Sequence, residues 1–309
     1  NSLFEDAAEY GYGMKLAADA NKALLESYMN EFLELGLETP FNEAFKAWIE
    51  GKETVTTSKE ATAKIMNLKN ESVANEEGQA LVDKIFQLKD YMIKKSIWIF
   101  GGDGWSYDIG FGGVDHVLAS GEDINILVFD TEVYSNTGGQ SSKSTPLSAV
   151  AQFAASGKKV RKKDLGLMMT SYGYVYCAQV AMGANQNQTI KALKEAESYN
   201  GPSLVIAYAP CINHGLKAGM GKTQRREKEA VASGYWHLWR FNPLLSIDGK
   251  NPFVLDSKEP QESFQEFLQG EVRYASLKKA FPETADQLYA EAEEAAKERL
   301  ESYKKMENK

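Results

Sequence analysis

The chain has 309 residues, of which 43% are hydrophobic and 25% are charged, so its composition is that of a globular protein able to bury a substantial core. Its formal net charge of −8 argues against a nucleic-acid partner, because phosphate backbones are bound by net basic surfaces. No apolar run reaches the roughly 18 residues of a membrane-spanning helix, and the first residues do not resemble an export signal. We therefore expect no membrane contact and a cytoplasmic location.

Residues 1–95 have the spacing of amphipathic helices. Apolar side chains recur at helical intervals at Leu25, Tyr28, Phe32 and Leu35, and such a face needs a partner surface. Proline and threonine clusters divide the run into several helices. We expect a helical lead-in packed on a sheet, without catalytic residues.

Residues 96–210 alternate between apolar strands and helices. The pattern predicts strands at 97–100, 124–129, 174–180 and 203–208, and helices at 112–119 and 188–198. Near-continuous apolar strands separated by helices are typical of a parallel sheet with helices on both faces. The predicted fold class is therefore α/β.

The rest of the chain, 211–309, begins with a polar loop and is then mainly helical. A helix is predicted to end near Ala232, an aromatic run follows at 235–241, and further helices begin near Pro260. The last stretch, 290–309, is highly charged and is expected to be a solvated or wrapping tail. We expect a single domain over 1–309, made of a helical lead-in (1–95), an α/β core (96–210) and a loop with a helical C-terminal extension (211–309).

Polar loops follow the first two predicted strands. Gly102, Asp103 and Gly104 come after the first strand, and Thr131 opens the loop after the second. Ligands of open α/β sheets bind outside the carboxyl ends of the strands, so we expect both loops to face one crevice. Glycines there let backbone N–H groups approach phosphate oxygens, and a carboxylate between them can approach a cation.

Mg²⁺ takes oxygen ligands, typically one or two protein carboxylates completed by substrate phosphates and water. Candidate ligands are the carboxylate of Asp103, the hydroxyl of Thr131 and the carbonyl of Val133. By itself, Gly-Asp-Gly is more often a tight turn with a surface aspartate. The segment between Asp103 and Thr131 is long enough for one βαβ crossover, however, and this spacing favours a site for a metal-bound diphosphate.

Longer strings of the sequence resemble one enzyme family. The strings GGDGWSYDIGFGGVDHVLASGEDINILVFDTEVYSNTGGQSSKSTP and SLVIAYAPCINHG resemble the C-terminal, thiamine-diphosphate-binding region of the pyruvate:ferredoxin (flavodoxin) oxidoreductases. NSLFEDAAEYGYGM and YWHLWRFNP extend the resemblance over nearly the whole chain. Many thiamine enzymes carry Asn at the position of Thr131, whereas this family uses Thr. The resemblance implies a thiamine-diphosphate-binding fold with helical N- and C-terminal extensions.

The resemblance also implies roles for individual residues. Asp103, Thr131 and the Val133 carbonyl are expected to bind Mg²⁺. The cofactor is expected to be lined by Gly102, Asp103, Gly104, Trp105, Thr131, Glu132, Val133, Tyr134, Ser135 and Asn136. Asn136 is expected near the thiazolium and the substrate, and is the candidate catalytic residue.

Cys211 follows the last predicted strand. A lone cysteine at such a position is usually structural, but the resemblance implies that Cys211 is one ligand of a [4Fe–4S] cluster. Four thiolates are normally required, and Cys177 has the surroundings of a core residue, so the other three are expected elsewhere. In this family the glutamate that activates the cofactor belongs to a separate pyrimidine-binding domain. Since the chain also begins at Asn1 rather than Met, we expect part of a longer enzyme, inactive by itself.

The function that the resemblance implies is the oxidative decarboxylation of pyruvate to acetyl-CoA, with electron transfer through iron–sulfur clusters. The implied cofactors are thiamine diphosphate, Mg²⁺ and a [4Fe–4S] cluster. The implied partners are the pyrimidine-binding and cluster domains of the same enzyme, pyruvate, coenzyme A, and ferredoxin or flavodoxin, in a homodimer. The alternatives are a subunit of another 2-oxoacid:ferredoxin oxidoreductase and a non-catalytic α/β interaction module.

Residues 158–163 form a basic run, KKVRKK. Its simplest interpretation is a solvated loop, and its sharper one is a docking patch for acidic ferredoxin or for the phosphates of coenzyme A. Among the histidines, His116 and His237 are expected to be structural. His214 lies close to Cys211, but two ligands do not make a zinc site.

Overall fold

The computed structural model describes residues 7–308 and divides into two compact units. One unit contains Tyr10–Ile97, and the other contains Trp98–Lys309 with residues that precede Tyr10. The division falls close to the predicted end of the helical lead-in, although the prediction treated both units as parts of one domain. The first six residues of the quoted motif at 1–14 lie outside the described residues.

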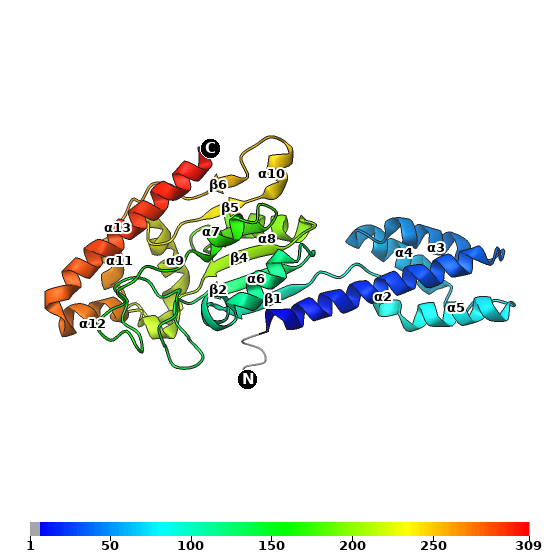
Figure 1. Ribbon diagram of the computed structural model, residues 1–309, viewed down its shortest axis with the longest axis horizontal. Coiled ribbons are helices and arrows are strands. Elements are labelled where there is room, and N and C mark those ends of the chain that lie inside the picture. Colours follow the sequence, from blue (N-terminus) through cyan, green and yellow to red (C-terminus); the bar gives the residue numbers. More distant parts are fainter. Residues whose placement is uncertain (1–6, 309) are drawn as a thin grey trace. The chain divides into compact units, whose positions relative to one another are not determined.

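The unit of Tyr10–Ile97 is helical, as the spacing predicted. It contains most of α2 (Ala8–Glu34) together with α3 (Phe41–Gly51), α4 (Val55–Asn67) and α5 (Glu76–Gln87) (Figure 1). Thr54 and Asn75 begin α4 and α5, because each side chain accepts a hydrogen bond from a backbone N–H in the first turn. The apolar faces enclose a core that includes Leu25, Met29, Phe32, Phe41, Phe45, Trp48, Ile65, Val82 and Ile85.

The second unit is built on a six-stranded sheet with the order β1-β2-β4-β3-β5-β6. The four predicted strands are β1 (Trp98–Gly102), β2 (Asn125–Asp130), β3 (Tyr176–Val180) and β4 (Ser203–Tyr208), and they are parallel. β1 and β2 pair so that Gly102 lies opposite Phe129. The loops after these two strands therefore leave the same edge of the sheet, and the predicted α/β class is confirmed.

Two further strands make the sheet mixed. β5 (Trp239–Phe241) pairs antiparallel with β3, and β6 (Phe253–Leu255) pairs antiparallel with β5. The sequence did not predict either strand, because each has only three residues and β5 contains a charged one. Arg240 is nevertheless buried, since its guanidinium pairs with Asp256 at 2.8 Å and Glu195 at 2.8 Å.

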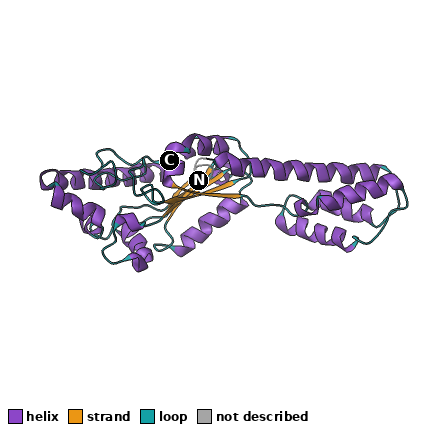
Figure 2. Ribbon diagram, turned by 90° about the horizontal axis from the view of Figure 1, so that it is seen from below, coloured by secondary structure: helices purple, strands orange, loops and turns teal. Residues whose placement is uncertain are grey.

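Helices lie on both sides of the strands (Figure 2). They are α6 (Phe111–Ala119), α7 (Leu165–Thr170), α8 (Gln186–Ser198), α9 (Thr223–Ala232), α10 (Pro243–Ile247), α11 (Phe264–Gln269), α12 (Val272–Ala280) and α13 (Pro282–Glu307). Within the part of the chain that the structure covers, no helix is both long enough and apolar enough to cross a membrane.

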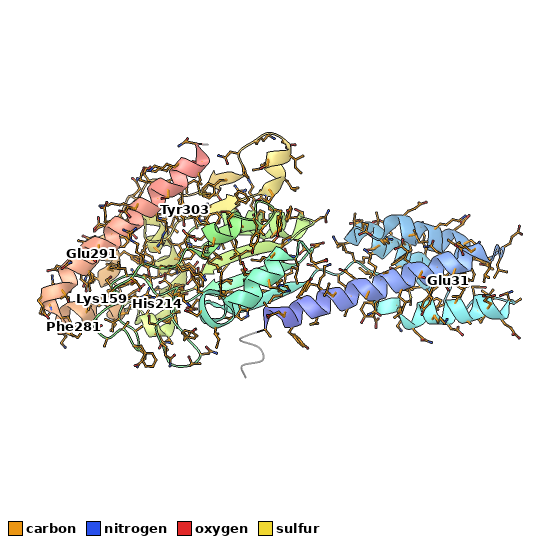
Figure 3. All side chains as sticks on the ribbon, in the orientation of Figure 1. Glu31, Lys159, His214, Phe281, Glu291 and Tyr303 are labelled. Atoms are coloured by element: carbon orange, nitrogen blue, oxygen red, sulfur yellow. The ribbon has the colours of Figure 1, made fainter. Side chains whose placement is uncertain are left out.

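The charged C-terminal stretch is a packed helix rather than a solvated tail. α13 buries one face, which includes Ala292, Ala296 and Leu300. Tyr303, labelled in Figure 3, donates a hydrogen bond to Asp164 at 2.8 Å. Its ring stacks on Phe253 of β6 and makes a tilted contact with Trp239 of β5. Most charges of this stretch therefore occupy the outer face of an amphipathic helix, whereas Arg299 lines an interior pocket.

Candidate functional site

The end of β1 is shaped by close contacts between backbone and aromatic rings. A Cβ added at Gly101 would lie 2.0 Å from the ring of Trp105, and one added at Gly104 would lie 2.3 Å from the ring of Tyr134. Any side chain at either position would displace a ring, so packing requires glycine at both. Between them stands Asp103, and one π-helical turn, Gly104–Ile109, follows.

The three predicted metal ligands are brought together by these strand ends. Thr131 Oγ1 is 2.7 Å from Asp103 Oδ1 and 3.1 Å from the carbonyl oxygen of Val133. The three oxygen atoms come from two loops that are far apart in the sequence. Oxygen atoms of this kind are the ligands that Mg²⁺ prefers.

A cavity of about 190 Å³ adjoins the Asp103 carboxylate. It is lined by Gly101, Gly102, Asp103, Gly104, Trp105, Ile109, Val133, Tyr134, Ser135 and Asn136. Most of the residues predicted to line the cofactor are therefore gathered around one space. Thr131 and Glu132 do not belong to the lining, and Gly101 and Ile109 were not predicted.

Asp103 is a buried carboxylate without a cationic partner. Its side chain is only 1% exposed, and it accepts hydrogen bonds from Ser142 Oγ at 2.6 Å and from Thr131 Oγ1. Burial, and next the negative charge of Asp130, raise the pKa of Asp103 to about 7. No lysine or arginine within residues 7–308 forms an ion pair with it, because Lys162 is paired with Asp130 and Glu132 instead.

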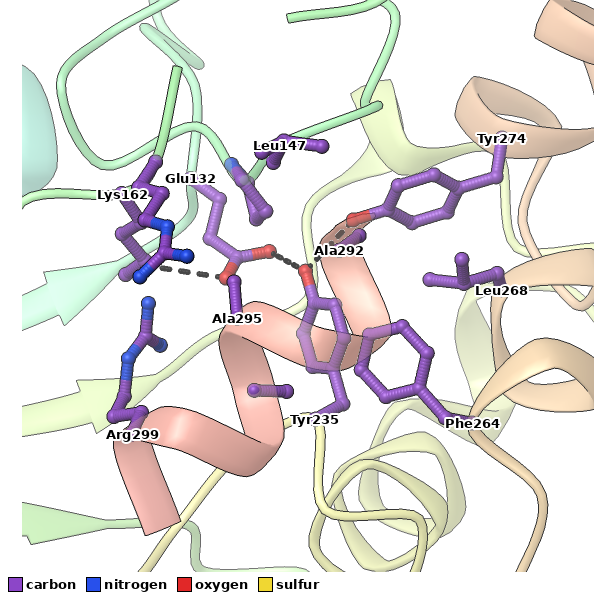
Figure 4. A pocket seen from close by; sticks show the side chains of 13 residues that line it. Glu132, Leu147, Lys162, Tyr235, Phe264, Leu268, Tyr274, Ala292, Ala295 and Arg299 are labelled. Atoms are coloured by element: carbon purple, nitrogen blue, oxygen red, sulfur yellow. Dashed lines mark hydrogen bonds and ion pairs between the residues drawn. The ribbon is translucent and has the colours of Figure 1, made fainter. Parts of the chain in front are cut away.

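Glu132 does not line the cavity beside Asp103 but a separate small pocket, together with residues that include Lys162 and Tyr235 (Figure 4). Its carboxylate lies 3.2 Å from Lys162 Nζ and 2.7 Å from Arg273 Nη2, and it accepts a hydrogen bond from the hydroxyl of Tyr235 at 2.5 Å. Burial alone would raise the pKa of Glu132, but the two cations lower it to about 2. Glu132 is therefore ionised, and its carboxylate is bound by Lys162, Arg273 and Tyr235.

The backbone of Glu132 is in the left-handed region, with φ at 60°. For a residue with a side chain this conformation costs roughly 1–2 kcal/mol. Such a residue persists only where its surroundings enforce it, and such residues cluster at functional sites. Beside Glu132 in this conformation, the Thr131 hydroxyl lies between Asp103 Oδ1 at 2.7 Å and the Val133 carbonyl oxygen at 3.1 Å.

The basic run 158–163 is divided between the fold and the surface. Lys158, Lys162 and Lys163 are bound within the fold, whereas Lys159, Val160 and Arg161 are exposed, so only part of the run is a solvated loop, and the docking patch stays a prediction. Lys162 Nζ lies 2.7 Å from Asp130 Oδ2, and Lys163 Nζ donates to the Tyr107 carbonyl at 3.2 Å. Lys158 donates to the Ser142 carbonyl, so this side chain too is bound within the fold. Lys159, labelled in Figure 3, is exposed.

His214 joins the second loop to the segment after β4. Its Nε2 lies 2.7 Å from the Thr131 carbonyl oxygen, and burial followed by the nearby Arg273 lowers its pKa to about 4. The imidazole is therefore neutral at pH 7 and donates this hydrogen bond. His214 positions the loop that carries Thr131.

Cys211 is buried close to the same loop. The backbone and side-chain N–H groups of Asn213 lie 3.4 and 3.5 Å from its Sγ. Cys177 is separate, since it lies fully buried in β3. Over residues 7–308, no three or more His, Cys, Asp or Glu side chains are arranged to hold a metal ion.

Several residues that support the site were not predicted. They are Tyr107, Asp130, Ser142, Ser144, Lys162, His214, Tyr235 and Arg273. The hydroxyl-rich segment that contains Ser142 and Ser144 was a usable signal, because it follows the second loop directly. The sequence held no such signal for Tyr235 and Arg273, since they are distant from Glu132 in sequence and contact it only in the folded chain.

The comparisons with known proteins define the class first. Residues 86–207, which include β1 to β3, both loops and β4 except its last residue, match the family described as thiamine pyrophosphate enzyme, C-terminal TPP binding domain. This part of the chain is therefore similar to the C-terminal TPP-binding domains of thiamine pyrophosphate enzymes.

Individual relatives define the region further. The chain is 56% identical over 306 residues to pyruvate-flavodoxin oxidoreductase of Klebsiella pneumoniae, which covers 99% of this chain and 26% of that protein. It is 56% identical over 308 residues to pyruvate:ferredoxin oxidoreductase of Moorella thermoacetica, with the same coverage. Pyruvate dehydrogenase [NADP(+)], mitochondrial, of Euglena gracilis is 44% identical over 311 residues, 99% of this chain and 17% of that protein.

The chain corresponds in sequence to the thiamine-pyrophosphate-binding region of the pyruvate:ferredoxin (flavodoxin) oxidoreductases, and the predicted resemblance is confirmed. It spans about a quarter of the length of the first two relatives.

Proposed function

We propose that this chain holds the diphosphate of thiamine diphosphate through one Mg²⁺ bound by Asp103, Thr131 and the Val133 carbonyl. The observation that carries the proposal is the spacing of the three oxygens. Two neighbouring ligands of an octahedral Mg²⁺ with bonds of 2.0–2.1 Å lie about 2.9 Å apart. Thr131 Oγ1 is 2.7 and 3.1 Å from the other two oxygens. The three oxygens fit this ion in chemistry, and both separations from the Thr131 hydroxyl fit it in distance.

The charges around the site support the same proposal. In the network behind the second loop, the acids Asp130, Glu132 and Glu271 are paired with Lys162, Arg226 and Arg273. Asp103 stands outside these pairs, and burial raises its pKa to about 7. A divalent cation would supply the missing positive charge, while the remaining charge of the ion would attract a diphosphate.

The cavity supports a role for this chain as one part of a larger site. Pockets for small ligands usually measure about 300–1,000 Å³, whereas this cavity measures about 190 Å³. We propose that it takes the diphosphate end, and that the pyrimidine-binding domain of the same enzyme encloses the rest. The glutamate that activates the cofactor belongs, in this proposal, to that domain.

The proposed reaction of the whole enzyme is the oxidative decarboxylation of pyruvate to acetyl-CoA, in a cytoplasmic homodimer. Bound thiamine diphosphate supplies the nucleophilic carbon and electron sink for the decarboxylation. Ser135 and Asn136, which line the cavity, would orient the cofactor and substrate there, and the buried Trp105 would limit the access of water.

Electron transfer in this proposal passes through a [4Fe–4S] cluster that has Cys211 as one ligand. The N–H groups of Asn213 that face the Cys211 sulfur would stabilise a ligating thiolate. Coenzyme A and ferredoxin or flavodoxin are the remaining proposed partners. The relatives are named for three different acceptors, so this region by itself leaves the acceptor open.

A thiamine diphosphate titration of the chain, with and without Mg²⁺, tests the proposal. Binding is expected only with Mg²⁺, with quenching of tryptophan fluorescence because Trp105 lines the cavity. Asp103→Ala should abolish the Mg²⁺-dependent part. Binding that persists unchanged in Asp103→Ala would refute the metal assignment, and the absence of any binding would favour a non-catalytic interaction module.

A further inference from the structure

We propose that Glu132 is a positioning residue, whose buried carboxylate fixes the loop that presents Thr131 and Val133 to the metal. This inference rests on the proposed function, because it assigns the device that keeps the proposed ligands in place. It differs from the role that the resemblance implies for Glu132, which is to line the cofactor. The cavity beside Asp103 does not include Glu132 in its lining.

The side chain of Glu132 is anchored by three groups that come from distant parts of the chain. Lys162 lies in the basic run, Tyr235 follows α9, and Arg273 lies in α12. Figure 4 shows the carboxylate between Lys162 and the hydroxyl of Tyr235, with the Tyr274 hydroxyl beyond. The Glu132 and Arg273 side chains are each only 1% exposed. The anchor is therefore isolated from solvent and from salt screening.

The backbone of Glu132 is fixed as well. Its N–H donates to Asp130 Oδ1 at 3.2 Å, and its carbonyl accepts a hydrogen bond from Thr145 Oγ1 at 2.6 Å. The preceding carbonyl, that of Thr131, is held by His214 at 2.7 Å. Both peptide groups that flank the Glu132 Cα thus have a defined partner. On either side of Glu132, the Thr131 hydroxyl contacts Asp103 at 2.7 Å and the Val133 carbonyl at 3.1 Å.

The left-handed backbone explains why an acid stands at this position. Glycine adopts a φ of 60° without steric strain, but it adopts other backbone conformations just as readily. It also has no side chain that could be anchored. Glutamate resists this conformation, and its ion pairs hold it there. The loop therefore has one enforced conformation rather than several accessible ones, and the two oxygens next to Glu132 are preorganised for a cation.

If Glu132 loses its charge, both basic residues that pair with it keep an ion pair with a second acidic residue. Lys162 keeps Asp130 at 2.7 Å, and Arg273 keeps Glu271 at 2.6 Å. Glu132→Gln is therefore a mild change to the fold, and it separates a loss of positioning from a loss of folding. A matched control is Asp256→Asn, which removes one acid from Arg240 and leaves it Glu195 at 2.8 Å, away from the loop.

The experiment measures the Mg²⁺ concentration that gives half-maximal binding of thiamine diphosphate to the 309-residue chain, at a temperature where circular dichroism shows each variant to be folded. Glu132→Gln should raise this midpoint about tenfold or more, the usual effect of removing a group that orients metal ligands. Asp256→Asn should leave it within about twofold of wild type, since its ion pair does not touch the loop. Glu132→Gly, which suits the backbone and lacks the anchor, takes the place of Glu132→Gln if the latter does not fold.

An unchanged midpoint in the folded Glu132 variant would overturn the inference. An equal rise in Asp256→Asn would also overturn it, because the effect would then reflect general loosening. Wild-type chain without Mg²⁺-dependent binding would instead refute the proposed function, and the inference with it. The wild-type titration alone therefore distinguishes a failure of the proposed function from a failure of the inference about Glu132.

Discussion

The two units of this chain fill their interiors in different ways. The helical unit is packed around apolar side chains, and its buried polar residues among those described are Lys15, Ser58 and Thr62. The α/β unit buries a set of charged side chains: Asp103, Asp130, Glu132, Arg226, Glu227, Arg240, Glu271 and Arg273. Buried ion pairs add little stability compared with apolar packing. The concentration of several of them behind the two loops therefore indicates a role in positioning a site.

Among the changes that test this difference between the two units, Arg273→Leu is expected to have the largest effect on stability. This change leaves Glu132 and Glu271 buried without one of their cations, so it should lower the free energy of unfolding of the α/β unit by about 3–5 kcal/mol. Hydrogen–deuterium exchange, read from peptides of each unit, measures the loss. Protection of the amides in α3 to α5 should not change.

Two results would contradict this expectation. If exchange in the α/β unit were unaffected, the network would not be important for its stability. If α3 to α5 lost protection equally, the two units would unfold as one, and the comparison between them would fail.

A change of pH is expected to have a smaller effect on the free energy of unfolding, again in the α/β unit alone. Burial lowers the pKa of His237 to about 3, below the 6.5 of an unfolded chain, so the unfolded state binds the proton first. The stability that depends on neutral His237 is complete above pH 6.5 and is lost as the pH falls toward 3. Between pH 7 and 5 this loss amounts to about 2 kcal/mol.

The matched variant is His237→Gln, which should show a flatter dependence of unfolding free energy on pH over that range. The helical unit contains none of the chain's three histidines, so its amides should not share the slope. A wild-type slope that His237→Gln retains in full would assign the acid sensitivity to other groups.

Much of the α/β architecture was predictable because its signals are local. The strands β1, β2 and β4 are apolar runs bounded by turns, and their parallel order follows from the intervening helices. The spacing from Asp103 to Thr131 predicted that both would reach one edge of the sheet, and they lie 2.7 Å apart. The helical unit was likewise visible in the spacing of residues such as Leu25 and Phe32.

The remaining features depend on contacts between distant residues. The strand β5 was missed because Arg240 interrupts its apolar pattern, and its burial depends on Asp256 and Glu195. The buried part of the basic run was not predicted, because sequence alone does not show that Asp130 and Glu132 lie inside the fold, where they pair with Lys162. Sequence could place Glu132 in the second loop but not show that it lines a different pocket from Asp103.

The central claim is that Asp103, Thr131 and Val133 hold one divalent ion that carries the diphosphate of thiamine diphosphate. Crystals of the chain grown with Mn²⁺ and thiamine diphosphate, measured with X-rays near the manganese edge, test it most directly. The account predicts one anomalous peak within coordination distance of the three oxygens and of the diphosphate. An ordered cofactor whose diphosphate lies elsewhere, or a manganese peak away from Asp103, would contradict it.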